Sequence, residues 1–314
     1  MEKNQYIEFQ DRVINLYIEH PEVKQIWKSL DSKRMWRSRG IDNFNSPHHM
    51  FLMGKSRVEK TQAVKRYAEQ SVKQSGRTFY YDEEGSKIKI IPVVYAEIPD
   101  RFTPKEFYNN IIEGLGAIKL YGRVEVGQLK DRALYLLKKH RTEMLVLDEL
   151  NYLLPYANKT KAQAMELVKG LANKAGVCLI CVGTPEIEVL RTMNEQFIGR
   201  YPPRTIPRFE ECDDSFISLL NKIELELGLE KPIGLADSAL GYPLVLHKLS
   251  LGFIGWLVPM LQNAMDIIGV MEPDFDDFNV LNRLNGNILI EAQRNVVGDI
   301  TKNDIKKILR GKTN

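Results

Sequence analysis

The chain lacks the features that place a protein outside the cell or in a membrane. Three cysteines in 314 residues are too few for a disulfide-stapled fold and suit a reducing compartment. No uninterrupted apolar stretch approaches the roughly 20 residues of a membrane helix, and the first residues contain no apolar leader. The formal net charge of +3 is too small to indicate a polyanionic partner by itself. We therefore expect a soluble, cytoplasmic globular protein without a membrane partner.

Two of the cysteines, Cys178 and Cys181, have a spacing that also occurs in metal sites. They lie within the apolar run Val177–Val182, and no second pair follows them. A free cysteine often behaves as a small buried apolar side chain. We therefore expect both to pack in the core.

Strand and helix patterns alternate through the first two thirds of the chain. Apolar runs predict strands at 49–53, 87–98, 144–147 and 177–182, and helical periodicity predicts helices at 61–73, 104–114, 129–140 and 161–175. This alternation is typical of an α/β fold with a parallel sheet flanked by helices. After Pro207 only helical patterns follow.

These patterns predict four segments. Residues 1–45 form an N-terminal helical segment that breaks at Pro21, and residues 46–209 form the α/β domain. Residues 210–290 form a helical lid domain. A polar tail, 291–314, follows and contains one more short helical pattern at 305–309.

The most informative feature is the segment Gly54–Thr61, which follows an apolar strand and opens a helix. A phosphate-binding loop in this setting reads Gly, four residues, Gly, Lys, and then Ser or Thr. Lys60 is expected to contact the phosphates of ATP, and the Thr61 hydroxyl to ligate Mg²⁺. The nucleotide-binding residues that the motif predicts are Gly54, Lys55, Ser56, Arg57, Val58, Glu59, Lys60, Thr61 and Gln62.

Glu59 stands where the second glycine of the motif belongs. Glycine there lets the backbone adopt conformations closed to other residues and come close to phosphate. A carboxylate about 4 Å from a phosphate charge would repel it by about 4 kcal/mol at an effective dielectric near 20. The repulsion falls if Glu59 turns outward or pairs with Lys55. We expect ATP to bind, and hydrolysis stays open.

Polar residues at the ends of two later strands complete the expected site. Asp148 and Glu149 end the apolar strand at 144–147, where Asp148 would hold Mg²⁺ and Glu149 would orient or deprotonate the attacking water. Thr184 ends the next strand, where a polar side chain would sense the γ-phosphate, although this stretch by itself is more typical of a simple strand-end turn. Arg200 is a candidate arginine finger, although a lone arginine is usually a solvated surface residue.

The order of these motifs resembles the TniB/TnsC family of AAA+ transposition ATPases, relatives of the phage Mu B protein. The resemblance covers roughly residues 8–305 and is carried by Asp11–Val13, His20–Pro21, Gly54–Thr61, Pro92–Pro99, Phe107–Tyr108, Glu113–Gly116, Leu145–Leu154, Val182–Glu186, Gln196–Arg200 and Ser250–Gly255. The stretches Gly183–Glu186 and Ser250–Gly255 are more specific than the ATPase motifs. Trp256 follows the second of them, so no sensor arginine is placed in the lid.

The resemblance implies a P-loop AAA+ ATPase that regulates DNA transposition. Such proteins bind ATP between adjacent subunits and assemble as homo-oligomeric rings or filaments on duplex DNA. They connect a target selector of the TniQ type to the transposase. By position, Arg200 would then be the finger that reaches a neighbouring subunit, and Thr184 would be the sensor.

The candidates for contact with duplex DNA are Lys105, Lys119 and Arg123. Each alone is more typical of an ordinary solvated charge, and only as a group with the basic stretch Lys33–Arg39 do they give modest support. Contacts to the DNA backbone carry no sequence information. Two other functions remain open. One is a non-hydrolysing AAA+ scaffold whose nucleotide site is degraded by Glu59. The other is a helicase-loader or clamp-loader type of ATPase, which shares the core motifs but not the lid stretch.

Overall fold

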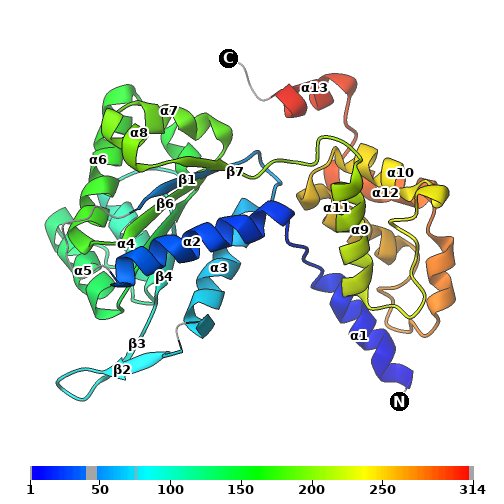
Figure 1. The fold of residues 1–314 in the computed structure, drawn as a ribbon, viewed down its shortest axis with the longest axis horizontal. Coiled ribbons are helices and arrows are strands. Elements are labelled where there is room, and N and C mark those ends of the chain that lie inside the picture. The colour runs from blue at the N-terminus through cyan, green and yellow to red at the C-terminus, as the bar shows by residue number, and fades with distance from the viewer. Residues whose placement is uncertain (1, 40–47, 75, 311–314) are drawn as a thin grey trace. The chain divides into compact units, whose positions relative to one another are not determined.

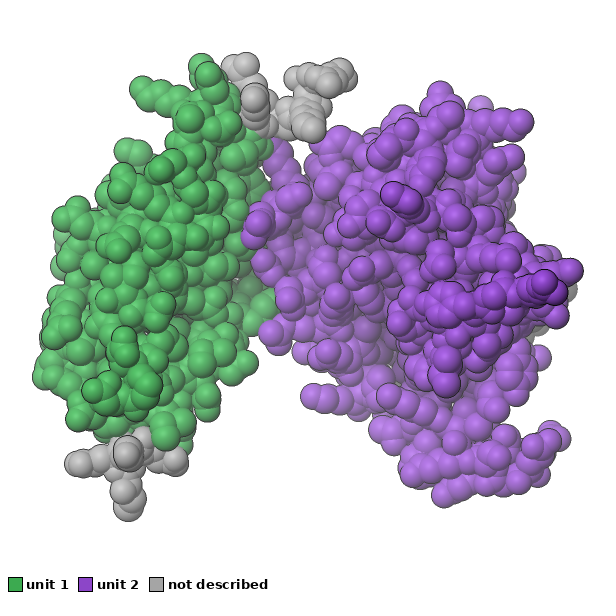
Figure 2. Space-filling view, turned by 180° about the vertical axis from the view of Figure 1, so that it is seen from behind, with its two compact units in different colours: residues 1–20, 207–314 green, residues 21–206 purple. Residues whose placement is uncertain are grey.

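The structure, a computed structural model, describes residues 2–39, 48–74 and 76–310. The chain forms two compact units (Figure 2), one of residues 21–206 and the other of residues 1–20 together with 207–314. The break expected at Pro21 is also the boundary between the units, so the predicted N-terminal segment is divided between them.

The unit of residues 21–206 is an α/β fold built on five parallel strands in the order β4-β5-β6-β1-β7 (Figure 1). Its strands are β1 (Met50–Met53), β2 (Phe79–Tyr81), β3 (Lys87–Lys89), β4 (Val93–Glu97), β5 (Met144–Asp148), β6 (Cys178–Gly183) and β7 (Pro203–Thr205). Its helices are α2 (Pro21–Arg39), α3 (Lys60–Gln74), α4 (Pro104–Gly114), α5 (Val126–Lys139), α6 (Asn158–Ala175), α7 (Glu188–Thr192) and α8 (Glu195–Arg200), with short 3₁₀ turns η1 (Leu150–Leu153) and η2 (Pro185–Ile187). The predicted parallel sheet flanked by helices is confirmed.

Helices cover both faces of this sheet. Leu145 and Leu147 of β5 belong to the hydrophobic core that α4, α5 and α6 complete. Helices α2 and α3 contact the sheet outside that core. They are tied to each other where the Trp27 ring donates to the Ala63 carbonyl at 3.1 Å and Tyr67 donates to Asp31 at 2.7 Å. Helices α2 and α3 therefore pack as a connected pair on the sheet.

The strand predicted at 87–98 is two strands in the structure. Its first part, β3, pairs with β2 as an antiparallel hairpin outside the main sheet, and its second part is β4. Pro92 separates them, because proline has no N–H to donate to a ladder. Strand β7 was not predicted, since its three residues are exposed and carry no apolar alternation.

The second unit is helical. Its helices are α1 (Glu2–Ile14), α9 (Asp214–Leu227), α10 (Tyr242–Ser250), α11 (Ile254–Ile267), α12 (Gly286–Val297) and α13 (Lys302–Arg310), with 3₁₀ turns η3 (Ser238–Leu240) and η4 (Phe278–Arg283). Phe9 and Val13 of α1 pack in one core with α9 and α11. Among the described residues no single helix is long and apolar enough to cross a membrane. Only α10 and α11 taken together, across a bend of 118°, reach that length and composition.

A tight turn explains the lid stretch Ser250–Gly255. Gly252 has φ +73°, and a Cβ there would lie 1.8 Å from the Phe209 carbonyl oxygen, so only glycine fits. The Phe209 N–H donates to the Gly252 carbonyl at 3.0 Å, and the Gly252 N–H donates to the Ser250 hydroxyl at 3.2 Å. Trp256 is buried and packs on Phe253, which gives this position a core role.

Cys178 and Cys181 are both fully buried in β6, as expected for core residues. The Cys178 thiol donates to the His48 carbonyl. Burial raises the pKa of the Cys178 thiol to about 12. Both side chains therefore remain protonated and serve packing.

His49 is a buried histidine whose neutral form the fold requires. Its Nδ1 accepts the Leu179 N–H at 3.0 Å, and its ring stacks on Tyr201 with centroids 4.3 Å apart. Burial, with the nearby charges of Arg200 and Lys33, lowers its pKa from 6.5 to about 4. Below about pH 6.5 the unfolded chain therefore binds a proton that the folded state does not.

We expect this difference to make the free energy of unfolding decrease as pH falls from about 6.5 towards 4. The slope is about 1.4 kcal/mol per pH unit for His49 alone. His49→Gln keeps an acceptor for Leu179 but does not titrate, so its loss of stability between about pH 6.5 and pH 5 should be smaller by about 2 kcal/mol. Urea unfolding of both proteins at the two pH values measures this. Equal losses would contradict the prediction.

Candidate nucleotide site

The loop from Gly54 to Glu59 connects β1 to the first turn of α3, so its N–H groups lie at a helix N-terminus. Gly54 is sterically required, since a Cβ there would lie 2.8 Å from Val58 Cγ2 and 2.9 Å from the Ile206 carbonyl oxygen. The Gly54 N–H donates to the Gly183 carbonyl at 3.2 Å, which joins the loop to the end of β6. This geometry is the strand–loop–helix arrangement that the motif predicts.

Glu59 adopts the left-handed backbone conformation of the glycine that it replaces, with φ +63°. A non-glycine residue is strained there by about 1–2 kcal/mol. Its side chain lines the cavity at the loop. Burial raises the pKa of this carboxyl, and the charges of Arg57, Lys60 and Arg66 oppose the shift. Glu59 therefore adopts a backbone conformation that glycine would favour, and it is one of the residues that line the cavity.

Lys60 is held inside the loop by the loop's own backbone. Its Nζ donates to the Lys55 carbonyl at 2.9 Å. Burial lowers the pKa of Lys60, and nearby carboxylates, Asp148 first and then Glu149, oppose that effect. The ammonium group is thus held at the loop by a backbone carbonyl.

Thr61 and Asp148 meet across the cavity. The Thr61 hydroxyl donates to Asp148 Oδ2 at 2.7 Å, and the Glu149 N–H donates to Asp148 Oδ1 at 2.8 Å. A hydroxyl beside a buried carboxylate supplies the oxygen ligands that Mg²⁺ prefers, and this ion usually takes one or two carboxylates with water and phosphate. The described residues hold no cluster of three or more His, Cys, Asp or Glu side chains suited to a metal. The donor set thus fits Mg²⁺ brought with a nucleotide.

Glu149 also has a left-handed backbone, with φ +58°, at the turn after β5. Asn151 donates to Glu149 Oε2 at 2.9 Å and fixes the carboxylate. Asn151 Oδ1 is buried without a hydrogen-bond partner in the structure, beside Gly183. Strain and a fixed carboxylate at a strand end are typical of a functional site.

Two residues that the motifs do not identify, Tyr95 and Glu97, reach the same edge of the sheet. The Tyr95 hydroxyl lies 2.7 Å from Glu97 Oε1 and 3.1 Å from Asp148 Oδ2. Lys65 Nζ is 3.4 Å from Glu97 Oε1. The parallel register that pairs Glu97 with Asp148 would have indicated this, because neighbouring parallel strands end at one edge.

The loop after β1 and the ends of β5 and β6 surround a cavity of about 260 Å³. It is lined by Ser56, Arg57, Glu59, Lys60, Thr61, Gln62, Asp148, Glu149, Asn151, Gly183 and Thr184. The fold therefore brings the loop, the end of β5 and Thr184 to one place. Thr184 begins the η2 turn, and its side chain makes no capping hydrogen bond there.

The remaining candidates lie away from this cavity. Arg200 is exposed at the end of α8, and Lys105 and Arg123 are exposed as well. Lys119 pairs with Glu113 at 2.8 Å and donates to Asn110 at 3.0 Å, so its charge is already engaged within the unit.

The basic stretch Lys33–Arg39 is only partly a surface feature. The Arg34 guanidinium pairs with Glu143 at 2.8 Å and is mostly buried, so this residue links α2 to the start of β5. The side chains of Trp36–Arg39 lie outside the described residues. Arg34 therefore stabilises the fold and does not form an exposed basic patch.

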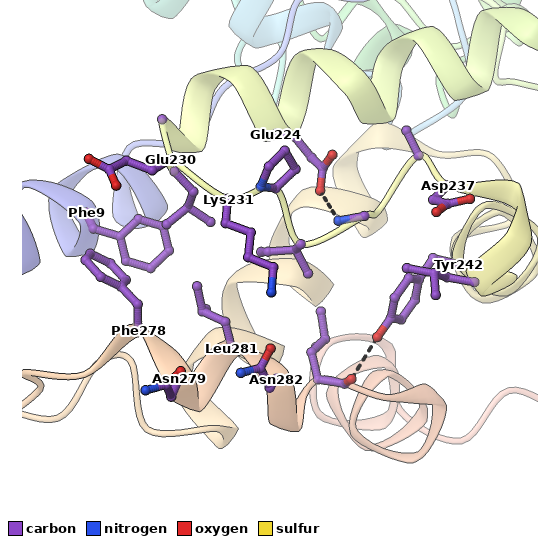
Figure 3. Close-up of a pocket in the computed structure, with 18 of the residues that line it drawn as sticks. Phe9, Glu224, Glu230, Lys231, Asp237, Tyr242, Phe278, Asn279, Leu281 and Asn282 are labelled. Atoms are coloured by element: carbon purple, nitrogen blue, oxygen red, sulfur yellow. Dashed lines mark hydrogen bonds between the residues drawn. The ribbon is translucent and has the colours of Figure 1, made fainter.

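A larger cavity, of about 1220 Å³, lies within the helical unit (Figure 3). Several of its polar groups are used inside the unit. Glu224 accepts the Gly234 and Leu235 N–H groups, and Tyr242 donates to the Leu284 carbonyl at 2.7 Å. Apolar side chains such as Phe9 and Leu281 line much of the rest. The start of α12 also lines it, and there the Asn285 side chain already accepts the Asn287 and Ile288 N–H groups.

Solved structures with a similar fold belong to ORC and Cdc6 AAA+ ATPases. The Aeropyrum pernix ORC1 protein in complex with DNA matches with a TM-score of 0.58 and 15% identity, over 91% of this chain and 69% of that chain. Drosophila ORC bound to DNA matches with a TM-score of 0.58 and 14% identity, over 94% and 66%. Cdc6p from Pyrobaculum aerophilum matches with a TM-score of 0.56 and 14% identity, over 96% and 74%. Identities this low show the fold alone.

No curated protein matches the chain. The family model of the bacterial TniB protein matches residues 11–211, which include the whole α/β unit and every residue that lines the cavity of about 260 Å³. That match covers more than half of the chain, and the protein therefore belongs to the TniB family.

Proposed function

We propose that the protein is an ATP-dependent, DNA-binding AAA+ regulator of transposition that oligomerises on duplex DNA and connects a TniQ-type target selector to a transposase. Membership of the TniB family supports the role in transposition. The similar ORC structures that contain DNA support a DNA partner. The observation that carries ATP binding is the Thr61–Asp148 hydrogen bond, which joins the loop to β5 at one cavity.

In the proposed mechanism Lys60 exchanges the Lys55 carbonyl for the β- and γ-phosphate oxygens. Thr61 and Asp148 would hold Mg²⁺, which when bound would neutralise part of the phosphate charge. The N–H groups at the start of α3 face the phosphates, where the helix dipole also favours anions. Lys60, Thr61 and Asp148 all line the same cavity, so binding would exchange their present hydrogen bonds for contacts to the phosphates and Mg²⁺.

Hydrolysis would depend on Glu149, Thr184 and Arg200. Glu149, fixed by Asn151, orients the attacking water. Thr184 contacts the γ-phosphate from the end of β6. Arg200 is exposed and does not line the cavity of its own chain, so it would act on the nucleotide of a neighbouring copy. Exposure alone does not distinguish a finger from a solvated arginine, so a test in trans is needed.

Glu59 supports a second candidate, a scaffold that binds ATP without hydrolysing it. Its carboxylate lines the same cavity as Lys60 and would face the phosphates. Repulsion between this carboxylate and the phosphates would raise the energy of any transition state that gathers more negative charge there, and so would slow hydrolysis. A scaffold of this kind would still assemble with ATP, so turnover separates the two functions.

A mixing experiment tests the leading proposal. Arg200→Ala and Glu149→Gln should each abolish ATP turnover stimulated by duplex DNA, measured as phosphate release. An equimolar mixture restores activity if Arg200 acts in trans, because about a quarter of randomly formed head-to-tail interfaces contain both intact residues. Arg204→Ala, an exposed arginine on β7, is the control and should be active.

Two results would count against the proposal. A mixture no more active than its components would exclude a finger at Arg200. Wild-type protein without turnover, with or without DNA, would favour the scaffold.

A further inference from the structure

The β2–β3 hairpin carries two aromatic and two basic side chains on one face. Its register places Phe79 opposite Lys89 and Tyr81 opposite Lys87, and residues that face each other across an antiparallel pair point the same way. All four are exposed. Tyr80 and Ile88 point the other way, and Ile88 is buried. We call Phe79, Tyr81, Lys87 and Lys89 the hairpin face.

The hairpin is fixed to the α/β unit and is not a loose loop. Tyr80 donates to the Lys139 carbonyl at 2.7 Å, and His140 Nδ1 lies 2.8 Å from the Lys89 carbonyl oxygen. The Arg141 guanidinium lies 3.9 Å from the centre of the Tyr80 ring. These contacts hold the inner side of the hairpin against the end of α5. An isolated two-stranded hairpin would be marginal in water, so this anchoring presents the outer face as a fixed surface.

The two rings on the hairpin face are not needed for the core. Phe79 is 40% and Tyr81 64% exposed, and neither belongs to the hydrophobic core of the unit. Their centroids are 5.6 Å apart in an edge-to-face arrangement. Lys87 Nζ lies over the Phe79 ring, 4.0 Å from its centre, in a cation–π contact. In Figure 1 the hairpin extends away from the rest of the α/β unit, where a partner can reach it.

Both charged side chains of this face are basic, which favours a polyanion, and the three carboxylates of the hairpin, Asp82, Glu83 and Glu84, lie in its turn. The charged members of the face are Lys87 and Lys89, and Arg77 is exposed just before β2. In the turn Asp82 Oδ1 accepts the Glu84 and Ser86 N–H groups, so that carboxylate serves the turn itself. Lysines alone would suit an acidic peptide as well as a nucleic acid. The exposed rings beside them favour a nucleic acid, because its flat bases can stack on them.

We propose that the hairpin face binds single-stranded nucleic acid, with Lys87 and Lys89 on phosphates and with Phe79 and Tyr81 stacked against unpaired bases. Base–aromatic stacking tolerates any sequence because every base has a flat face. None of the four residues lines the nucleotide cavity, so this binding requires no ATP. The site is therefore separate from the duplex contacts of the proposed function.

Fluorescence anisotropy with a labelled oligothymidylate, measured without nucleotide, tests the proposal. Phe79→Ile with Tyr81→Ile keeps two strand-forming apolar residues but removes the rings, and it should weaken binding at least about tenfold. Lys87→Gln with Lys89→Gln should lower the slope of log K against log salt by about 1.4, or about 0.7 for each phosphate that a lysine no longer neutralises. Tyr81→Phe retains the ring and should bind as wild type.

Matched controls separate local from general effects. Tyr121→Ile removes another exposed ring, and Lys159→Gln with Lys231→Gln removes the same charge from exposed positions elsewhere. Both should bind the oligonucleotide as wild type. Thermal unfolding of every variant checks the fold. Unchanged oligonucleotide binding by the variant with Phe79→Ile and Tyr81→Ile would overturn the proposal. So would polyglutamate that competes as well as unlabelled oligothymidylate, because that result would identify a peptide site. If the wild type binds the oligonucleotide as expected but does not assemble on duplex DNA with ATP, the proposed function is contradicted and the hairpin site is not.

Discussion

Glu59→Gly is expected to bind ATP at least about tenfold more tightly than the wild type, because it removes a carboxylate that faces the phosphates. At about 4 Å and an effective dielectric near 20 the repulsion approaches about 4 kcal/mol. The charges of Arg57, Lys60 and Arg66 offset part of it. Titration with a fluorescent ATP analogue measures the change.

The free energy of unfolding separates the effect of the Glu59 charge from the effect of its strained backbone. Glycine relieves the strain at φ +63°, so Glu59→Gly should also raise the free energy of unfolding by about 1 kcal/mol once the greater freedom of the unfolded chain is subtracted. Glu59→Gln removes the charge but keeps the strained backbone. It should gain ATP affinity without the full gain in stability. If neither variant binds ATP more tightly, the carboxylate does not face the phosphates.

The same pair of variants bears on hydrolysis. An inactive wild type that gains turnover in Glu59→Gly would show that this one side chain had converted an ATPase into a scaffold. Turnover in the wild type would show that the glycine conformation, which Glu59 retains, is sufficient.

Lys60→Ala is expected to abolish ATP-dependent assembly on duplex DNA. The ammonium group would make charge-assisted hydrogen bonds to two phosphates, each worth about 1.5–3 kcal/mol, so ATP affinity should fall at least about 100-fold. Lys73→Ala, on the last turn of the same helix and exposed, is the matched control. Electron microscopy with duplex DNA and a slowly hydrolysed ATP analogue should show regular oligomers for wild type and control.

Two results of that experiment would contradict part of the proposed function. Normal assembly of Lys60→Ala would show that assembly does not use this nucleotide site. Isolated monomers in the wild-type images would contradict assembly on DNA, although the nucleotide site itself would stand. The nucleotide titration therefore has to accompany the images.

The residues that meet at the candidate site could largely be predicted, because their placement depends on local patterns. The loop motif places Lys60 and Thr61 at a helix N-terminus, and the apolar strand before Asp148 places that residue at a strand end. In a parallel sheet the carboxyl ends of neighbouring strands lie at one edge, so the topology alone brings these residues together. The Thr61–Asp148 contact is the direct result of this topology.

Other parts depend on contacts that a local pattern does not carry. Tyr95 looks like any apolar strand residue, and only its register beside β5 brings its hydroxyl to Asp148. Arg34 reads as one of a basic run, yet a distant partner, Glu143, buries it. Strand β7 has no pattern of its own and pairs only because β1 offers an open edge. The role of Arg200 needs a second copy of the chain.

The helical unit is assembled from both ends of the described chain, and this affects how the protein is made. Helix α1 is synthesised early, but α9 and α11, which bury its Phe9 and Val13, follow roughly 200 residues later. At about 5–20 residues per second a ribosome needs about 10–40 s to reach them. During that interval the α/β unit between them can complete its own core, while α1 keeps an apolar surface that only later translation covers.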